Sequence, residues 1–313
     1  MTAVFDESIS YHVDASTFQE PLVKLAEVLA QKLKREAAQR LAPTPSFVAV
    51  DLHVLMRQVM YTYNCLFYLN ADETRKNDPH WRLEYSVVTL PLIRNMIDCF
   101  YNITAILEDP RVNGPWFRKS GYRKALEGFD EEEKRYGGRP EWDEWIEKGR
   151  DGLDFQIRGV DLVKSDVLTT QAWPTLGKYV SDKRSGGVTT PHQNFLKMFL
   201  YGRWREYSAM AHGGFEGLLR AGMFYIRDSA PHEDRPKIED AHDRVFSSHI
   251  GRAALVLLCI ITELQAYFRF DDDGARINER IHSMWKALMV IPEVKEVYDL
   301  HYEQLMKDTG INP

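Results

Sequence analysis

Helical periodicity is the feature that most constrains what this chain can fold into. Apolar side chains recur every three or four residues along almost every long segment of the 313 residues, and convincing alternating strands are absent. In the first long segment, one helical face carries Leu22, Leu25, Leu29 and Leu33. We therefore expect an all-α, multi-helical bundle with neither a sheet nor a mixed α/β core.

Proline, glycine and charged clusters divide this pattern into separate helices. The expected helices cover residues 21–41, 47–69, 79–107, 191–211, 215–226, 238–268 and 275–306. Pro91 lies inside the third helix and predicts a kink there. The segments 182–187 and 228–235 are expected loops, and 271–274 is expected to separate the last two helices.

The segment 111–168 has a different composition, because its tryptophans stand among many charged residues. It predicts two solvated helices, which form either a charged helical insertion or the outer layer of the same bundle. The rest of the chain is expected to belong with it to a single all-helical domain, residues 1–313. Trp142, Trp145 and Phe155 are interpreted as packing residues, since their acidic surroundings would repel a nucleic-acid strand.

Composition sets limits on the partners and the location of the protein. Because 40 Lys and Arg oppose 46 Asp and Glu, no global field draws the chain onto nucleic acid, so an RNA partner would need a local basic patch. The longest apolar stretch, 253–261, is too short for a bilayer. We expect a cytoplasmic protein without a membrane span. Its dispersed cysteines, Cys65, Cys99 and Cys259, are expected to be buried thiols.

Most known catalytic and metal-binding motifs are missing from the sequence, which has no Walker lysine and no H-E-x-x-H. His242 and His249 are seven residues apart, so they share a helix face and could hold a metal together with a carboxylate such as Asp240. Histidines at this spacing more often cap, pack or face water. The expectation is therefore that the protein needs no metal and no cofactor, and the histidine pair is the third of three hypotheses.

One constellation has the spacing of a functional site. Six residues separate Arg205 from His212, and a seven-residue step along a helix returns to nearly the same face. Tyr201 and Ser208 lie on that face as well. The glycine pair that follows His212 predicts the end of the helix there.

An all-helical chain with this arginine and histidine spacing resembles the superfamily called higher eukaryotes and prokaryotes nucleotide-binding. Its motif is an arginine followed, after four to six residues, by a histidine. The segments 92–98, Leu-Ile-Arg-Asn-Met-Ile-Asp, and 207–213, Tyr-Ser-Ala-Met-Ala-His-Gly, are similar to an uncharacterised family of bacterial helical proteins of comparable length. The resemblance covers roughly residues 79–270 as a pattern of helices.

The resemblance implies an RNA-directed or nucleotide-binding function. Many members of the superfamily are metal-independent endoribonucleases of bacterial stress, toxin–antitoxin or phage-defence systems, and others only bind nucleotides. Transferred to this sequence, Arg205 would bind phosphate and His212 would transfer a proton. Glu206 departs from the small polar residue that often follows the arginine, and its charge would repel phosphate if it faced the site.

The resemblance also implies a homodimer, because members usually join two arginine–histidine helices into one composite site. The small residues Gly202 and Ala209 would permit such an approach. An antitoxin or another partner protein would be a further expected contact.

Arg94 has two interpretations that the sequence leaves open. It forms a structural ion pair with Asp98, one turn later, or it points into the same cleft as Arg205 and His212. In the second case the substrate-binding residues would be Arg94, Tyr201 and Ser208.

The alternative function is a non-catalytic helical protein-interaction module. In that case Arg205 is held by Glu206 or a neighbouring carboxylate, and His212 only caps the helix. Replacing either residue would then lower stability, because the partners of a buried polar group would be left unpaired.

Overall fold

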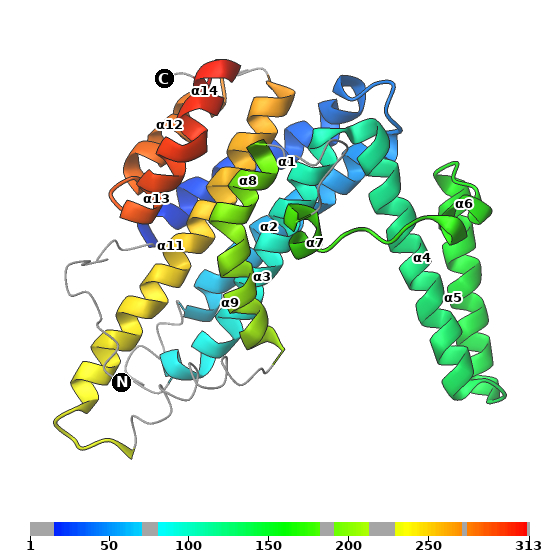
Figure 1. Cartoon of the computed structure of the whole chain (residues 1–313), viewed down its shortest axis with the longest axis horizontal. Coiled ribbons are helices and arrows are strands. Elements are labelled where there is room, and N and C mark those ends of the chain that lie inside the picture. The colour runs from blue at the N-terminus through cyan, green and yellow to red at the C-terminus, as the bar shows by residue number, and fades with distance from the viewer. Residues whose placement is uncertain (1–15, 71–80, 182–190, 213–228, 271–273, 312–313) are drawn as a thin grey trace.

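The computed structural model describes residues 16–70, 81–181, 191–212, 229–270 and 274–311. All regular structure in these residues is helical, and no strand occurs among them. This confirms the predicted all-α, multi-helical fold. Most helices gather in one bundle, and the remaining ones extend away from it as an arm (Figure 1).

Two groups of helices build the bundle. Its long members are α1 (Ser16–Arg40), α2 (Ser46–Asn70), α3 (Trp81–Glu108) and α11 (Arg235–Phe268). Shorter elements complete it: α7 (Leu176–Ser181), α8 (Pro191–Leu196), α9 (Gly202–Ala211), α12 (Ile277–Leu288), α13 (Pro292–Val297) and α14 (Glu303–Thr309). The predicted boundaries of the long helices agree with these bounds to within a few residues.

The helix α11 forms the core of the bundle and contacts α1, α2, α3, α12 and α14. Its segment Ser248–Phe268 is long and apolar enough to cross a membrane, yet 83% of its most apolar window is buried inside the protein. The burial of this surface is what the central helix of a bundle requires. The apolar character of α11 is thus explained by packing.

One expected helix is interrupted in the structure, and two contain π-helical turns. The prediction of one helix over 275–306 is wrong, because the chain leaves the helical conformation at Ile291 (φ −87°, ψ 118°) before Pro292. A residue that precedes proline is sterically disfavoured in the α conformation. In addition, π-helical turns replace α-helix at Lys197–Tyr201 (η2) and Tyr298–Tyr302 (η4). The element η2 joins α8 to α9 without a break.

Two predicted segments lie outside the described residues, namely the helix 215–226 and the loop 182–187. Cys99 and Cys259 are buried as expected, whereas the prediction for Cys65 is wrong because its side chain is exposed on α2.

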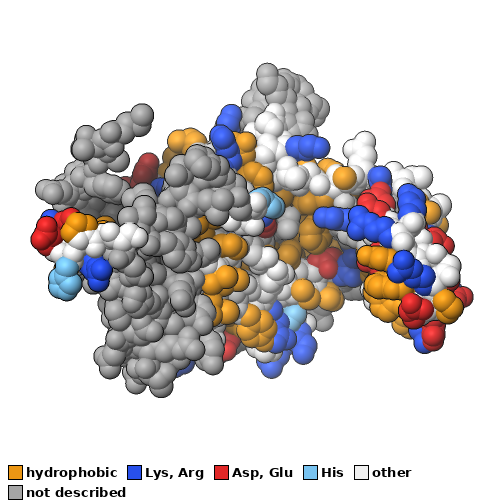
Figure 2. Space-filling model, turned by 90° about the horizontal axis from the view of Figure 1, so that it is seen from below, with side chains coloured by type: hydrophobic (Ala, Val, Ile, Leu, Met, Phe, Trp, Pro, Cys, Tyr) orange, Lys and Arg blue, Asp and Glu red, His pale blue; other side chains and the backbone are white. Residues whose placement is uncertain are grey.

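The charged segment forms the arm, which consists of α4 (Pro110–Tyr136), α5 (Pro140–Gly159) and the short α6 (Lys164–Thr169). Figure 1 shows α4 and α5 side by side, pointing away from the bundle. The arm has a small core of its own, made of Tyr122, Leu126, Ile157 and Val167. Charged and apolar side chains share its surface at the right of Figure 2. Trp145 and Phe155 are exposed on this arm. The two predicted solvated helices are confirmed, while the insertion stays a prediction.

The base of α4 packs closely on α2. Gly114 is buried there, and a Cβ atom at this position would lie 2.5 Å from Cγ2 of Val48. Arg118 adds a hydrogen bond from Nε to Oδ2 of Asp51 at 2.9 Å. Burial raises the pKa of Asp51, and the bond and charge of Arg118 oppose that rise. A small residue and an ion pair therefore fix the direction in which the arm leaves the bundle.

We expect Gly114→Ala to lower the free energy of unfolding by about 1–3 kcal/mol, because the fully buried, β-branched Val48 cannot move aside. Gly121→Ala is the matched control in the same helix, since nothing lies within 4 Å of a Cβ atom there. It should raise stability by about 0.5–1 kcal/mol through helix propensity. Urea unfolding measures both, and equal effects at the two glycines would contradict this packing.

Candidate functional site

Arg205 and His212 lie on the outer face of α9. Seven steps of about 100° bring them to within about 20° of each other around the helix axis. Both side chains are exposed, and in the described part of the chain no side chain forms an ion pair or hydrogen bond with either of them. His212 is the C-cap, and its backbone N–H donates to the carbonyl of Ser208 at 3.1 Å. The predicted end of the helix at His212 is confirmed.

One inner side of α9 is attached to α3 through Trp204. The indole Nε1 donates to Oδ1 of Asp98 at 2.8 Å, and the Arg94 guanidinium lies 4.9 Å from the centre of the indole ring. Nη1 of Arg94 is 3.5 Å from Oδ2 of Asp98. Burial raises the pKa of Asp98, while the Trp204 hydrogen bond and the Arg94 charge oppose the rise. These contacts form the ion pair that the structural interpretation of Arg94 expects, and none of them joins Arg94 to Arg205 or His212.

The other inner side is attached to α11 through Tyr207, which is fully buried. Its hydroxyl lies 3.0 Å from Nδ1 of His249 and accepts a hydrogen bond from Nη1 of Arg252 at 3.4 Å. Nε of Arg252 in turn donates to Oε2 of Glu293 at 3.0 Å. Burial raises the pKa of Tyr207 to about 12, so the hydroxyl keeps its proton at neutral pH. The result is a polar network that fixes the rotation of α9.

This network also bears on the third hypothesis, in which His242 and His249 bind a metal. Nδ1 of His249 lies 3.3 Å from Nη1 of Arg252, and a guanidinium at that distance opposes a metal cation. The side chain of His242 lies outside the described residues.

Glu206 is turned away from the outer face. Its Oε2 accepts from Nη1 of Arg203 at 3.2 Å, and Nε of Arg203 also lies 3.4 Å from Oε1 of Glu293. The carboxylate that would repel phosphate is therefore neutralised by Arg203. Glu206 is therefore paired with Arg203, and it is not the carboxylate partner of Arg205, which the alternative interpretation assigns to Glu206 or to a neighbouring carboxylate.

Tyr201 and Ser208 border the outer face and are both half-buried. The Tyr201 ring is stacked with the Trp204 indole, with centroids 6.1 Å apart and an interplanar angle of 18°. The Ser208 hydroxyl donates to the Trp204 carbonyl at 2.6 Å, so its oxygen remains able to accept a hydrogen bond. Helical spacing places Ser208 between Arg205 and His212, whereas the Tyr201 ring packs on Trp204 and lies close to Gly177 of α7. Their role in substrate binding stays a prediction.

A basic groove of about 950 Å³ lies between α1, α2 and the region around the start of α12. Its cationic lining residues are Lys24, Lys32, Arg35, Arg57 and Arg280, against which only Glu27 and Glu36 supply carboxylates. This is the kind of local basic surface that an acidic protein needs in order to attract a polyanion. Sequence periodicity could not identify it, because its residues come from three helices.

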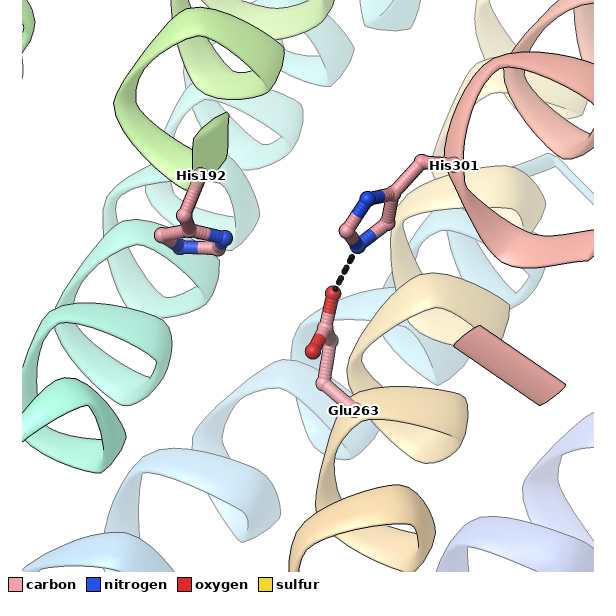
Figure 3. A group of neighbouring side chains, drawn as sticks. All are labelled: His192, Glu263 and His301. Carbon is pink, nitrogen blue, oxygen red and sulfur yellow. Dashed lines mark hydrogen bonds and ion pairs between the residues drawn. The ribbon is translucent and has the colours of Figure 1, made fainter. Parts of the chain in front are cut away.

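A second group missed by the sequence is the histidine–glutamate cluster, His192, Glu263 and His301 (Figure 3). One potential ligand atom from each residue lies within 4.8 Å of the others. The residues belong to α8, α11 and η4, and the closest two in sequence are still 38 positions apart. No local sequence motif predicts such a group, because the three residues meet only through the packing of their helices.

Comparison with protein-family models, with curated proteins and with solved structures finds no match for the chain.

The contacts that attach α9 to the bundle should contribute to the stability of the protein. Tyr207→Phe should lower the free energy of unfolding by about 1–3 kcal/mol, because it removes a buried hydroxyl from the partners His249 and Arg252. Arg205→Ala and His212→Ala should change it by less than about 0.5 kcal/mol, because both side chains are exposed. Chemical denaturation of the three variants checks this. A loss at Arg205 or His212 as large as that at Tyr207 would favour the interaction-module interpretation.

Proposed function

We propose that this protein acts on RNA as a metal-independent endoribonuclease of a bacterial stress or phage-defence system, with Arg205 and His212 as its catalytic pair. The observation that carries the proposal is the contrast along α9. Arg203, Trp204 and Tyr207 contact neighbouring helices, and Glu206 is paired with Arg203, whereas Arg205 and His212 are exposed on one face of the helix. The resemblance to the nucleotide-binding helical superfamily supplies the reaction class.

The chemistry follows from the two side chains. The His212 imidazole accepts the proton of a ribose 2′-hydroxyl, and the oxygen attacks the adjacent phosphorus to form a 2′,3′-cyclic phosphate. The bond to the 5′-oxygen of the next nucleotide breaks, and that oxygen takes up a proton. Arg205 donates hydrogen bonds to the phosphate oxygens as negative charge builds on them. No cofactor takes part in these steps.

The neighbouring residues have supporting roles in this proposal. Ser208 offers its hydroxyl oxygen to a ribose hydroxyl, and the half-buried Tyr201 offers a ring edge beside the phosphate. Arg94 acts as a positioning residue, because it holds the indole of Trp204 and thereby the helix. The basic groove on α1 and α2 supplies cations that would hold more distant phosphates of a long RNA.

The first test measures cleavage of a single-stranded RNA by the full chain. Arg205→Ala and His212→Ala should each reduce the rate by about 10²-fold or more, because each group acts mainly in the transition state. A chelator should leave the rate unchanged. The matched controls are Arg158→Ala, an exposed arginine of the arm, and His282→Ala on α12, and both should cleave like the unaltered protein.

Two outcomes of this test would contradict the proposed ribonuclease activity. If the unaltered protein leaves every tested RNA intact and binds none of them, the non-catalytic interaction module replaces the enzyme. If it binds RNA without cutting it, the nucleotide-binding branch of the superfamily applies, and the two alanine variants should then weaken binding.

The proposal includes a homodimer that pairs two α9 helices across a two-fold axis near His212, in the cytoplasm. Gly202 supports it, since it is exposed and a Cβ atom there would meet nothing within 4 Å, which leaves room for a second helix. Met198, which is 70% exposed on the preceding turn, adds apolar surface. An antitoxin or another protein could cover the same face.

Light scattering at micromolar concentration tests the dimer. The unaltered chain should have twice the mass of one protomer, and Gly202→Arg should convert it to a monomer by filling the contact. Gly152→Arg is the matched control, because that glycine lies on the arm and its Cβ position is also open. A monomeric unaltered chain would refute the composite site.

A further inference from the structure

We propose that the histidine–glutamate cluster binds one divalent metal ion of the zinc class, with a water molecule as the fourth ligand. Figure 3 shows the two imidazoles and the Glu263 carboxylate close to one another, with His192 on α8 and His301 on η4. Two imidazoles and one carboxylate are a ligand set that zinc takes in sites that keep one position open. This inference concerns a site apart from α9 and goes beyond the proposed ribonuclease function.

The spacing of the donor atoms fits such an ion. Nε2 of His301 lies 3.1 Å from Oε1 of Glu263. In a tetrahedral site with metal–ligand bonds of about 2.0–2.2 Å, neighbouring donor atoms are about 3.3–3.6 Å apart. One pair therefore already has nearly the required separation. The longest separation in the cluster is within 4.8 Å, so side-chain rotation is enough to bring the third donor to the ion.

The carboxylate has no permanently charged partner in the described part of the chain, because the His301 imidazole is charged only when it is protonated. The partners of Glu263 there are His301 and the Tyr302 hydroxyl, which donates to Oε1 at 3.2 Å, and no lysine or arginine pairs with it. Its side chain is only 13% exposed. Carboxylates in such places are normally paired with a cation or coordinate a metal, because burial of an uncompensated charge is costly. A bound ion would supply the missing positive charge.

Surrounding side chains hold two of the ligands in place. The Phe195 ring is stacked on the His301 imidazole, with centroids 4.2 Å apart and an angle of 16°. Tyr302 is fully buried and packs on Trp285, so the hydroxyl that orients Glu263 is itself fixed. Partners of this kind orient metal ligands and strengthen binding. His301 also lies within the π-helical turn η4, and such turns occur frequently at functional sites.

Solvent can reach the cluster, as an exchangeable metal requires. The His301 side chain is 24% exposed, and His192 is half-buried. An ion held there would join α8, which leads into α9, to the core helix α11 and to the C-terminal part of the bundle. Metal binding should therefore stabilise the folded protein.

The test uses the full chain, freed of metal by a chelator and then titrated with Co²⁺ and Zn²⁺. Calorimetry should give one Zn²⁺ per chain, and Co²⁺ should produce visible d–d absorption that saturates at the same ratio. His192→Gln, Glu263→Gln and His301→Gln should each weaken Zn²⁺ binding by at least about tenfold. The burial-matched control is His53→Gln, whose ring hydrogen-bonds to the Ala30 carbonyl and which should bind like the unaltered chain.

Two results would overturn the proposal: no saturable metal signal with the unaltered chain, or three variants that all bind Zn²⁺ as tightly as the unaltered chain. Circular dichroism verifies that each variant is folded. Glu263→Gln still offers an oxygen to Tyr302, and the titration of the unaltered chain is decisive even if that variant does not fold. Arg205→Ala and His212→Ala should keep full metal affinity, so failure of the metal site and failure of the ribonuclease proposal are distinguished.

Discussion

The two polar anchors of α9, Trp204 and Tyr207, are the constraint on which the candidate catalytic face depends. The indole of Trp204 is bound to Asp98 on α3, and the hydroxyl of Tyr207 lies in the network of His249, Arg252 and Glu293. Because these groups are buried or half-buried, breaking their hydrogen bonds would lower the free energy of unfolding. The helix therefore has one preferred rotation, in which Arg205 and His212 face outward.

Within the short helix α9, the side chains that stabilise the fold are different from those proposed to act on RNA. The side chains that hold α9 are enclosed by α3, α11 and α13, and those proposed to act on RNA are exposed. Glu206 belongs to neither group. Its negative charge would repel a phosphate, and the ion pair with Arg203 neutralises that charge. The arm formed by α4 and α5 is held on α2 by separate contacts at its base, those of Gly114 and Arg118.

Sequence periodicity predicts the helices of this fold well, because an apolar stripe repeats with the helix itself. It also places Arg205, Ser208 and His212 on one face, since their relation depends only on spacing. It cannot predict the anchors or the histidine–glutamate cluster, whose members meet through helix packing far along the chain. The π-helical turns could not be predicted from the sequence either. The break before Pro292 could have been predicted from the proline itself, although the expected helix 275–306 ran through it.

The most direct measurement is nuclear magnetic resonance of the histidine rings during titration with a single-stranded 2′-O-methyl RNA, which can bind but cannot be cleaved. The outward face of α9 predicts a saturable shift of the His212 ring signals, while those of the buried His249 stay in place. Arg205→Ala should weaken that shift. Unchanged His212 signals at saturating RNA would contradict the account.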